Sequence, residues 1–187
     1  MLLLVKNSNK RGKIMSLYDK YYKEVNYFGN PYPELIKYMK QLPKGTLIDL
    51  GAGQGRDSVP LSRMGFLVTS VDTSLVGLEQ IKLEEPKIKI LHKSFNDINV
   101  KEFDYILLDS IFHFYKNDLE KETKLLMQII ESMEVGAILI NCLLKNNSAE
   151  KHLKKIVNKF KIEILKDNYI DYQDFKSTYH LYVFRKK

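Results

Sequence analysis

The sequence contains one cysteine, four arginines and no long run of apolar residues. The single cysteine, Cys142, excludes an internal disulfide and a metal site built from several thiolates, and it fits a reducing cytosol. No apolar run approaches the ~18 residues needed to cross a bilayer, so an integral membrane protein is not expected. The apolar start at residues 1–5 is too short for a signal peptide and has no basic residues before it. We therefore expect a cytoplasmic protein.

The net charge of +7 is unevenly distributed along the chain. Residues 1–44 and 145–187 each carry +6, whereas residues 45–144 carry −5. Basic ends could form a rim that binds phosphate groups, as in proteins that recognise nucleic acid. The alternative, which the absence of an arginine cluster favours, is a lysine-rich, solvated surface. A nucleic-acid partner is therefore not expected, and the sequence leaves the oligomeric state open.

The order of apolar segments predicts a single α/β domain. Strands alternate with helices, which is typical of a doubly wound, mostly parallel sheet with helices on both faces. No helix separates the last two strands, so the last strand should run antiparallel, at one edge of the sheet. Residues 1–14 are expected to be a loose arm, residues 15–44 to form N-terminal helices, and residues 45–187 to form the main domain. Strands are expected at 46–50, 66–72, 87–92, 103–109, 137–144, 161–166 and 178–185. Helices are expected at 15–25, 74–84, 118–133 and 149–158, and two more should begin after Pro33 and Gly55. A polar, aromatic loop is expected at 167–177.

The strongest functional signal is the run LIDLGAGQGRD at positions 47–57. Gly51, Gly53 and Gly55 follow an expected strand and open a helix, where a tight turn and the close approach of a ligand favour glycine. The spacing differs from the G-x-G-x-x-G of dinucleotide folds, and the Lys-Ser/Thr ending of a nucleoside-triphosphate loop is absent. Asp49, two residues before the first glycine, would also repel a pyrophosphate. The motif therefore predicts a nucleoside-like ligand without a phosphate chain.

A second signal is Asp72, which ends the second expected strand, 21 residues after Gly51. A carboxylate at this place can accept hydrogen bonds from both ribose hydroxyls. Each signal also has a simpler explanation, because a glycine-rich turn can be only a turn and an aspartate at a strand end can cap the next helix. Their occurrence on consecutive strand–helix units favours a nucleoside site.

With these motifs the chain resembles the class I S-adenosylmethionine-dependent methyltransferases. Within that superfamily, the run FGNPYPELIKYMKQLPKG before the glycine motif is most similar to the small tellurite-resistance and thiopurine-type group, which methylates small molecules, often at sulfur, selenium or tellurium. The resemblance implies a Rossmann-like sheet of seven strands, S-adenosyl-L-methionine as cofactor, S-adenosyl-L-homocysteine as product, and a small-molecule acceptor. It extends from about Tyr27 to Leu144 and rests on LIDLGAGQGRD at 47–57, VTSVDTS at 68–74, FNDI at 95–98 and FDYILLDS at 103–110.

The resemblance also implies roles for individual residues. Gly51–Gly55 would pack against the methionine and ribose parts of the cofactor, and Asp49 would lie near the methionine amino group. Asp72 would hold the ribose, and Asp97 would accept a hydrogen bond from the adenine amino group. Arg56 could meet the cofactor carboxylate, or it could serve as a cap or a surface residue. The implied cofactor-binding residues are Asp49, Gly51, Ala52, Gly53, Gln54, Gly55, Arg56, Asp72, Thr73, Asn96, Asp97, Ile98 and Asp109.

Candidate catalytic residues are fewer, because methyl transfer is an in-line displacement that depends mainly on positioning. His113 could deprotonate or orient the acceptor, or it could only line the pocket. Tyr27 precedes a glycine in a loop and is expected beside the cofactor or the substrate. Aromatic faces attract a sulfonium charge, so aromatic residues near the N-terminus could form a lid, whereas Tyr32 and Tyr38 are expected to pack on the sheet. The candidate lid and substrate residues are Tyr18, Tyr22, Phe28 and Ser110.

No metal site is expected, and two other functions remain open. The four histidines form no metal-spaced pair, and a magnesium site built on Asp109 and Asn141 would lack a third ligand. The basic ends favour an RNA or protein methyltransferase as an alternative, although no inserted recognition domain separates the strands. A non-catalytic protein that binds S-adenosylmethionine would carry the same motifs.

Overall fold

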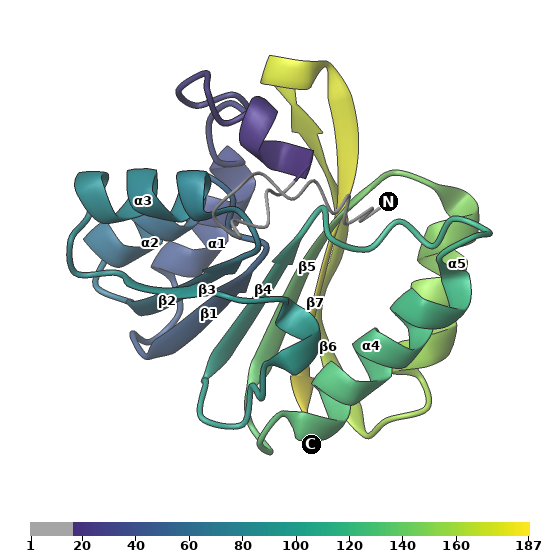
Figure 1. The fold of residues 1–187 in the computed structure, drawn as a ribbon. Helices are drawn as coiled ribbons and strands as arrows, with labels where there is room; N and C mark the ends of the chain where they lie inside the picture. Colours follow the sequence, from purple (N-terminus) through teal and green to yellow (C-terminus); the bar gives the residue numbers. More distant parts are fainter. Residues whose placement is uncertain (1–16) are drawn as a thin grey trace.

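The structure, a computed structural model, describes residues 17–187 (Figure 1). The predicted loose arm at 1–14 lies outside these residues. Seven strands form one sheet in the order β3-β2-β1-β4-β5-β7-β6, with helices packed on it, which confirms the predicted α/β class. The strands are β1 (Thr46–Leu50), β2 (Leu67–Asp72), β3 (Lys89–His92), β4 (Tyr105–Asp109), β5 (Ile138–Leu144), β6 (Ile162–Tyr172) and β7 (Ser177–Lys186).

The last strand is antiparallel, as predicted, but its predicted place at the edge of the sheet is wrong. Strands β1 to β5 pair in parallel, whereas β7 pairs antiparallel with both β5 and β6. Strand β7 therefore lies inside the sheet, and β6 forms the edge. The burial of the two strands explains this order, because every residue from Leu181 to Phe184 is buried, as an internal strand requires, while much of β6 is exposed.

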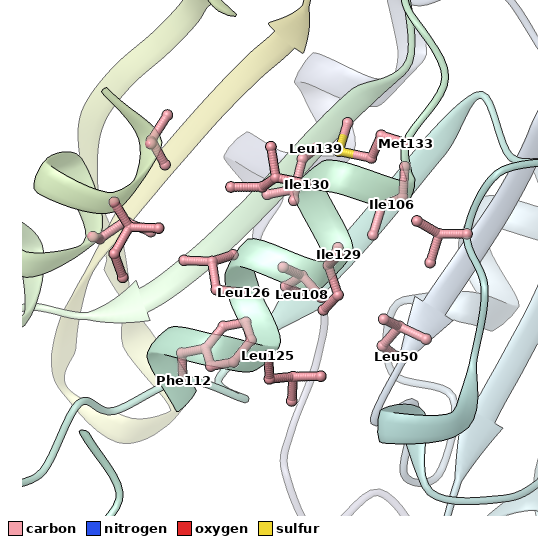
Figure 2. Packing of buried hydrophobic residues seen from close by; sticks show 14 of the residues in the cluster. Leu50, Ile106, Leu108, Phe112, Leu125, Leu126, Ile129, Ile130, Met133 and Leu139 are labelled. Atoms are coloured by element: carbon pink, nitrogen blue, oxygen red, sulfur yellow. The ribbon is translucent and has the colours of Figure 1, made fainter. Parts of the chain in front are cut away.

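Alternating side chains of the strands build two hydrophobic layers, one on each face of the sheet. Leu47 and Leu107 face the helices of the N-terminal half, whereas Ile48 and Leu108 face α4 and α5. Figure 2 shows the second layer, in which the buried stripe of α4 packs on β1, β4 and β5. The helices are α1 (Pro33–Lys40), α2 (Ser58–Arg63) and α3 (Leu75–Glu84) on one face, and α4 (Leu119–Ser132) and α5 (Asn147–Val157) on the other.

The predicted loop at 167–177 is mostly strand. Strand β6 continues to Tyr172, a short 3-10 turn, η3 (Gln173–Phe175), follows, and β7 begins at Ser177. Polar residues alternate here with the buried Ile170 and Tyr172. The exposed face of the strand therefore makes its sequence resemble that of a loop. The hairpin extends to the level of the N-terminal segment (Figure 1).

The helix predicted at 15–25 is also wrong over the residues that the structure describes. The segment begins with a 3-10 turn, η1 (Leu17–Lys20), and continues as turns to Phe28. The N–H of Tyr22 donates to the carbonyl of Tyr18 at 3.1 Å and the two rings stack 6.0 Å apart, but the helical turn does not continue, and Asn26 adopts a positive φ of 57°. None of the described helices is both long and apolar enough to span a membrane.

Candidate functional site

A cavity of about 360 Å³ lies at the carboxyl ends of the parallel strands. Its walls come from the loops after β1, β2, β3 and β4, from the N-terminal segment above them, and from the β6–β7 hairpin. Strand β1 is followed along the sheet by β2 on one side and by β4 on the other, so the chain reverses its winding direction here. Ligands of open α/β sheets bind at such a switch point.

The glycine loop after β1 forms the floor of the cavity. Gly53 has a positive φ of 54° and donates its N–H to a carboxylate oxygen of Asp72, at 2.8 Å. A Cβ on Gly53 would lie 2.8 Å from the hydroxyl of Tyr22, so the glycine allows the N-terminal segment to approach. A Cβ on Gly77 would overlap the carbonyl oxygen of Gly53, which explains a glycine near the start of α3. The loop is thus fixed against β2 and α3.

Asp72 is buried at the end of β2 and borders the cavity. One carboxylate oxygen accepts the N–H of Gly53, and the other accepts the N–H of Ser74 at 2.7 Å. Burial raises the pKa of Asp72, while these backbone hydrogen bonds act in the opposite direction. Each oxygen keeps acceptor capacity that can face the cavity.

Asp49 lies deeper, below the glycine loop, and is 3% exposed. The hydroxyl of Ser58 donates to its carboxylate at 2.6 Å, and the hydroxyls of Ser58 and Ser70 lie 2.6 Å apart. Burial raises the pKa of Asp49 to about 7, and the nearby Asp57 carboxylate acts in the same direction. The group therefore changes its charge near neutral pH and borders the cavity.

Arg56 connects the glycine loop with β4 through a buried ion pair. Its guanidinium contacts Asp109, lies 3.4 Å from a carboxylate oxygen of Asp57, and donates to the carbonyl of Phe28 at 3.3 Å. The hydroxyl of Tyr32 donates to Asp109 at 3.2 Å. Tyr32 packs on the sheet as predicted, but its hydroxyl also supports this cluster. The charge of Arg56 is thus compensated by two carboxylates.

The N-terminal segment is held over the cavity from two sides. On one side, Gln54 accepts the N–H of Tyr27 at 3.0 Å and donates to the carbonyl of Glu24 at 2.7 Å. On the other side, at the tip of the hairpin, Asp174 accepts the N–H of Asn30 at 2.8 Å, and the hydroxyl of Tyr172 lies 2.6 Å from the carbonyl of Asn30. Residues 144 positions apart in the chain therefore meet above the site.

The β4 side of the cavity is formed by a strained loop and the start of α4. Ser110 and Phe114 adopt positive φ values of 55° and 53°, which side chains other than glycine rarely do. A carboxylate oxygen of Glu122 accepts the N–H of both His113 and Phe114, and this holds the loop in place. Among the described residues, no group of three potential ligands is arranged to hold a metal ion.

Most of the predicted site residues border this one cavity, and a few do not. Gly55 is buried against α3, Ile98 is partly buried against the hydrophobic layer that includes α4, and Tyr27 is 36% exposed and does not line the cavity. The side chain of Asp97 lies outside the described part of the chain. The predicted residues in the lining are Tyr18, Tyr22, Phe28, Asp49, Gly51, Ala52, Gly53, Gln54, Arg56, Asp72, Thr73, Asn96, Asp109, Ser110 and His113.

Other lining residues were not predicted from the sequence. Some come from α4 and from the hairpin, which carry no recognisable motif, and the others lie in the N-terminal segment and in the loops after β1, β3 and β4, beside residues that were predicted. The amphipathic pattern of α4 could have indicated two of them, since the polar residues Asp118 and Lys121 lie at the start of this helix. The lining residues missed are Asn26, Asp57, Phe95, Ile111, Phe112, Asp118, Lys121, Glu122, Leu125, Phe175 and Tyr179.

The fold and the position of the cavity define the class of protein. The structure superposes on that of the N-methyltransferase NodS of Bradyrhizobium japonicum, which was solved in complex with S-adenosyl-L-homocysteine. The TM-score is 0.72, the superposition covers 90% of this chain and 95% of that chain, and the sequences are 12% identical. TehB of Haemophilus influenzae superposes with a TM-score of 0.69 over 91% of this chain and 66% of that chain, at 20% identity. The fold is therefore that of the class I methyltransferases, as the motifs predicted.

The sequence comparison identifies the family. The family model described as tellurite resistance protein TehB matches residues 15–179, so the chain belongs to the TehB family. A relative in Haemophilus influenzae strain Rd, named as a probable S-adenosyl-L-methionine-dependent methyltransferase TehB, is 29% identical over 127 residues. That match covers 62% of this chain and 44% of the relative, so the chain matches less than half the length of that protein. The predicted resemblance to this group is confirmed.

Proposed function

We propose that this chain is an S-adenosyl-L-methionine-dependent methyltransferase that acts on a small-molecule acceptor. The observation that carries the proposal is the pairing of Asp72 with the glycine loop on the floor of the cavity. A buried carboxylate with spare acceptor capacity, beside backbone that allows close approach, suits the ribose hydroxyls of a nucleoside. Membership of the TehB family and the shared fold support the same activity.

The charge of the cavity supports this cofactor in particular. S-adenosyl-L-methionine carries a sulfonium and an ammonium charge against one carboxylate, so it is a net cation. The described lining holds six carboxyl groups but only two permanently cationic side chains, Arg56 and Lys121. Such a lining favours a cationic ligand over a polyanion such as a dinucleotide or nucleoside triphosphate.

Different residues of the cavity would hold different parts of the cofactor and the acceptor. Asp72 would accept the ribose hydroxyls, the glycine loop would allow the close approach of the methionine part, and Asp49 would face its amino group. When bound, the cofactor supplies a methyl group on a positively charged sulfur. The β4–α4 loop would place the acceptor in line with this methyl group, and His113 would take up a proton where the acceptor releases one.

The first test is cofactor binding. S-adenosyl-L-methionine and S-adenosyl-L-homocysteine should raise the melting temperature by mass action on the folded state, whereas NAD and ATP should give no comparable shift. Asp72→Asn should weaken binding by about 1–3 kcal/mol in calorimetry, because charge-assisted hydrogen bonds to the ribose are lost. Asp171→Asn, an exposed change on β6, is the control. Unchanged affinity in Asp72→Asn would remove the ribose assignment.

Transfer itself requires a separate measurement, because a non-catalytic binding protein would pass the first test. Methyl-labelled cofactor should be turned over against a panel of thiol, amine, hydroxyl, selenite and tellurite acceptors. Label in a small product supports the proposed enzyme. Binding without transfer to any acceptor would favour the non-catalytic alternative.

We also propose that the N-terminal segment acts as a lid, with Tyr18, Tyr22 and Phe28 facing the cofactor. These three side chains border the cavity, and two of the hydrogen bonds that hold the segment come from the hairpin tip. Aromatic faces would attract the sulfonium charge and exclude water.

Gly29 provides a specific test of the lid. A Cβ at Gly29, where φ is +73°, would overlap the Tyr172 hydroxyl and the Asp174 carboxylate, so Gly29→Ala should break the contact with the hairpin. We expect cofactor affinity to fall by about tenfold in calorimetry, equivalent to about 1.4 kcal/mol. Gly136→Ala is the matched control, since φ is +94° there but a Cβ would meet nothing within 4 Å. Equal affinities of the two variants would rule out the hairpin contact as a support of the lid.

A further inference from the structure

One face of α3 receives the N-terminal segment. Ser74, Gly77 and Gln80 follow one another at intervals of three residues from the N-cap of α3, so they lie on the same side of this helix. The hydroxyl of Ser74 donates to the carboxylate of Asp19 at 2.5 Å. A Cβ on Gly77 would lie 3.2 Å from the ring of Tyr22, so the glycine leaves room for that ring. The segment is therefore supported by α3 as well as by the hairpin.

The third residue of this face, Gln80, forms an amide pair with Gln54 of the glycine loop. The Nε2 of Gln54 donates to Oε1 of Gln80 at 2.8 Å and to the carbonyl of Glu24 at 2.7 Å. The Oε1 of Gln54 accepts the N–H of Tyr27 at 3.0 Å. The Nε2 of Gln80 donates to the carbonyl of Tyr22 at 2.7 Å. The two amides together thus hold the backbone of the segment at residues 22, 24 and 27.

Each amide of the pair is suited to one orientation. The amide nitrogen of Gln54 faces two acceptors, the carbonyl of Glu24 and Oε1 of Gln80, so an oxygen in its place would lie against other oxygens. The amide nitrogen of Gln80 likewise faces the carbonyl of Tyr22. Both side chains are half-buried, where an acceptor that loses its donor is costly. A carboxylate of the same size at either position should therefore loosen the segment without leaving a cavity.

Tyr22 is the residue of the segment that these contacts hold against the floor of the site. Its side chain is 4% exposed and borders the cavity. Its hydroxyl lies where a Cβ on Gly53 would be 2.8 Å away, so the ring rests on the glycine loop. Burial raises the pKa of Tyr22, and the nearby carboxylate of Asp72 adds to this rise. A shift of the segment would therefore move an aromatic ring beside the carboxylate that we assign to the ribose.

We propose that Gln80 is a positioning residue for cofactor binding, which acts through Gln54 and the backbone of Tyr22 to hold the N-terminal segment over the cavity. Gln80 itself does not border the cavity. This inference rests on the proposed function and deepens its lid. The hairpin holds the segment at residues 28–30, whereas the amide pair holds residues 22–27 on the glycine loop and α3.

Gln80→Glu tests the inference, because it keeps the size of the side chain and removes its N–H donors. The ligand is S-adenosyl-L-homocysteine, whose net charge is zero, so the added carboxylate should attract or repel it little. We expect its dissociation constant in calorimetry at pH 7.5 to rise about five- to tenfold, since a carboxylate facing the carbonyl of Tyr22 releases the segment. Gln128→Glu, the same change on the exposed face of α4, is the matched control and should leave the affinity unchanged. Equal affinities of the two variants would overturn the proposal.

The pH dependence separates positioning from a general effect on the fold. A protonated glutamic acid carries an O–H that can donate to the carbonyl of Tyr22, as the amide of glutamine does. The dissociation constant of Gln80→Glu, divided by that of the natural protein at the same pH, should therefore fall toward one between pH 7.5 and about pH 4.5. A quotient that stays high at low pH would show that the variant only disturbs the fold, and would contradict the inference.

A measurement without ligand keeps the inference and the proposed function apart. The chain contains no tryptophan, so Tyr27→Trp places a single tryptophan in the part of the segment that the amide pair holds. Quenching of its fluorescence by acrylamide should be about twofold stronger when Gln80→Glu is added and unchanged when Gln128→Glu is added. If S-adenosyl-L-homocysteine does not bind the natural protein, the proposed function fails, and the quenching still decides whether Gln80 holds the segment. Equal quenching in the two backgrounds would overturn the inference while leaving the proposed function intact.

Discussion

Arg56→Ala is expected to destabilise the protein by about 3–5 kcal/mol at pH 7.5, because it leaves two buried carboxylates without their cation. Asp57 is buried with one carboxylate oxygen already lacking a hydrogen-bond partner, and the side chain of Asp109 is 5% exposed. Burial raises the pKa of Asp57, and the guanidinium of Arg56 opposes this rise. Urea denaturation followed by circular dichroism measures the loss.

Arg63→Ala is the matched control for this change. Arg63 also contacts two carboxylates, Glu84 at 3.2 Å and Glu85 at 3.5 Å, but its side chain is 54% exposed, so its removal should cost less than about 1 kcal/mol. The loss in Arg56→Ala should also shrink toward low pH, because the stranded carboxylates can then take up protons. A loss no larger than that of Arg63→Ala would show that the buried cluster does not stabilise the fold.

The floor of the site could be predicted from the sequence because its residues are close together in the chain. The loop at 51–56 and Asp72 belong to consecutive strand–helix units, and their backbone hydrogen bonds follow from those units. The strands were recognisable for a similar reason, since β1 and β4 are short apolar runs whose side chains are buried on both faces. Local pattern and tertiary structure agree at these places.

The remaining walls depend on contacts between distant segments, which no local pattern encodes. Tyr172 and Asp174 meet residues 28–30 only because β7 lies between β5 and β6 and brings the hairpin tip over the cavity. One side of the edge strand faces solvent, so the sequence of the hairpin is polar. This polarity is the reason that a loop was predicted there. The predicted N-terminal helix is wrong because only one turn forms at Tyr18–Tyr22, after which the chain turns back and Tyr27 packs on Tyr21.

The buried Asp49 is expected to make stability fall as the pH rises from about 4 to about 7. Its pKa is about 7 in the folded protein, against an ordinary value of 3.8 that we assign to the unfolded chain. Between these values the folded state holds a proton that the unfolded state has lost, so raising the pH favours unfolding. The full difference of about three pH units corresponds to about 4 kcal/mol.

Asp49→Asn isolates this contribution, because an amide cannot ionise. Relative to the natural protein, the variant should gain stability by up to about 4 kcal/mol between pH 4 and pH 7 and then show no further change. The comparison uses this pH dependence, since the amide also alters the hydrogen bond with Ser58. Asp118→Asn, at the half-buried rim of the same cavity, should show a much smaller change across this range. Parallel stability profiles for Asp49→Asn and the natural protein would show that Asp49 is not held protonated.

The same carboxyl group should couple cofactor binding to pH. A cationic amino group facing Asp49 favours its ionised form, so affinity for S-adenosyl-L-methionine should rise as the pH increases from about 5 to about 7 and then level off, in the direction opposite to stability. Near pH 6 binding should release a proton, which calorimetry detects as a dependence of the measured heat on the ionisation enthalpy of the buffer. Asp49→Asn should abolish this proton release. Release that persists in the variant would assign the proton to another group of the cavity, such as Asp57 or Asp72, whose pKa values burial also raises.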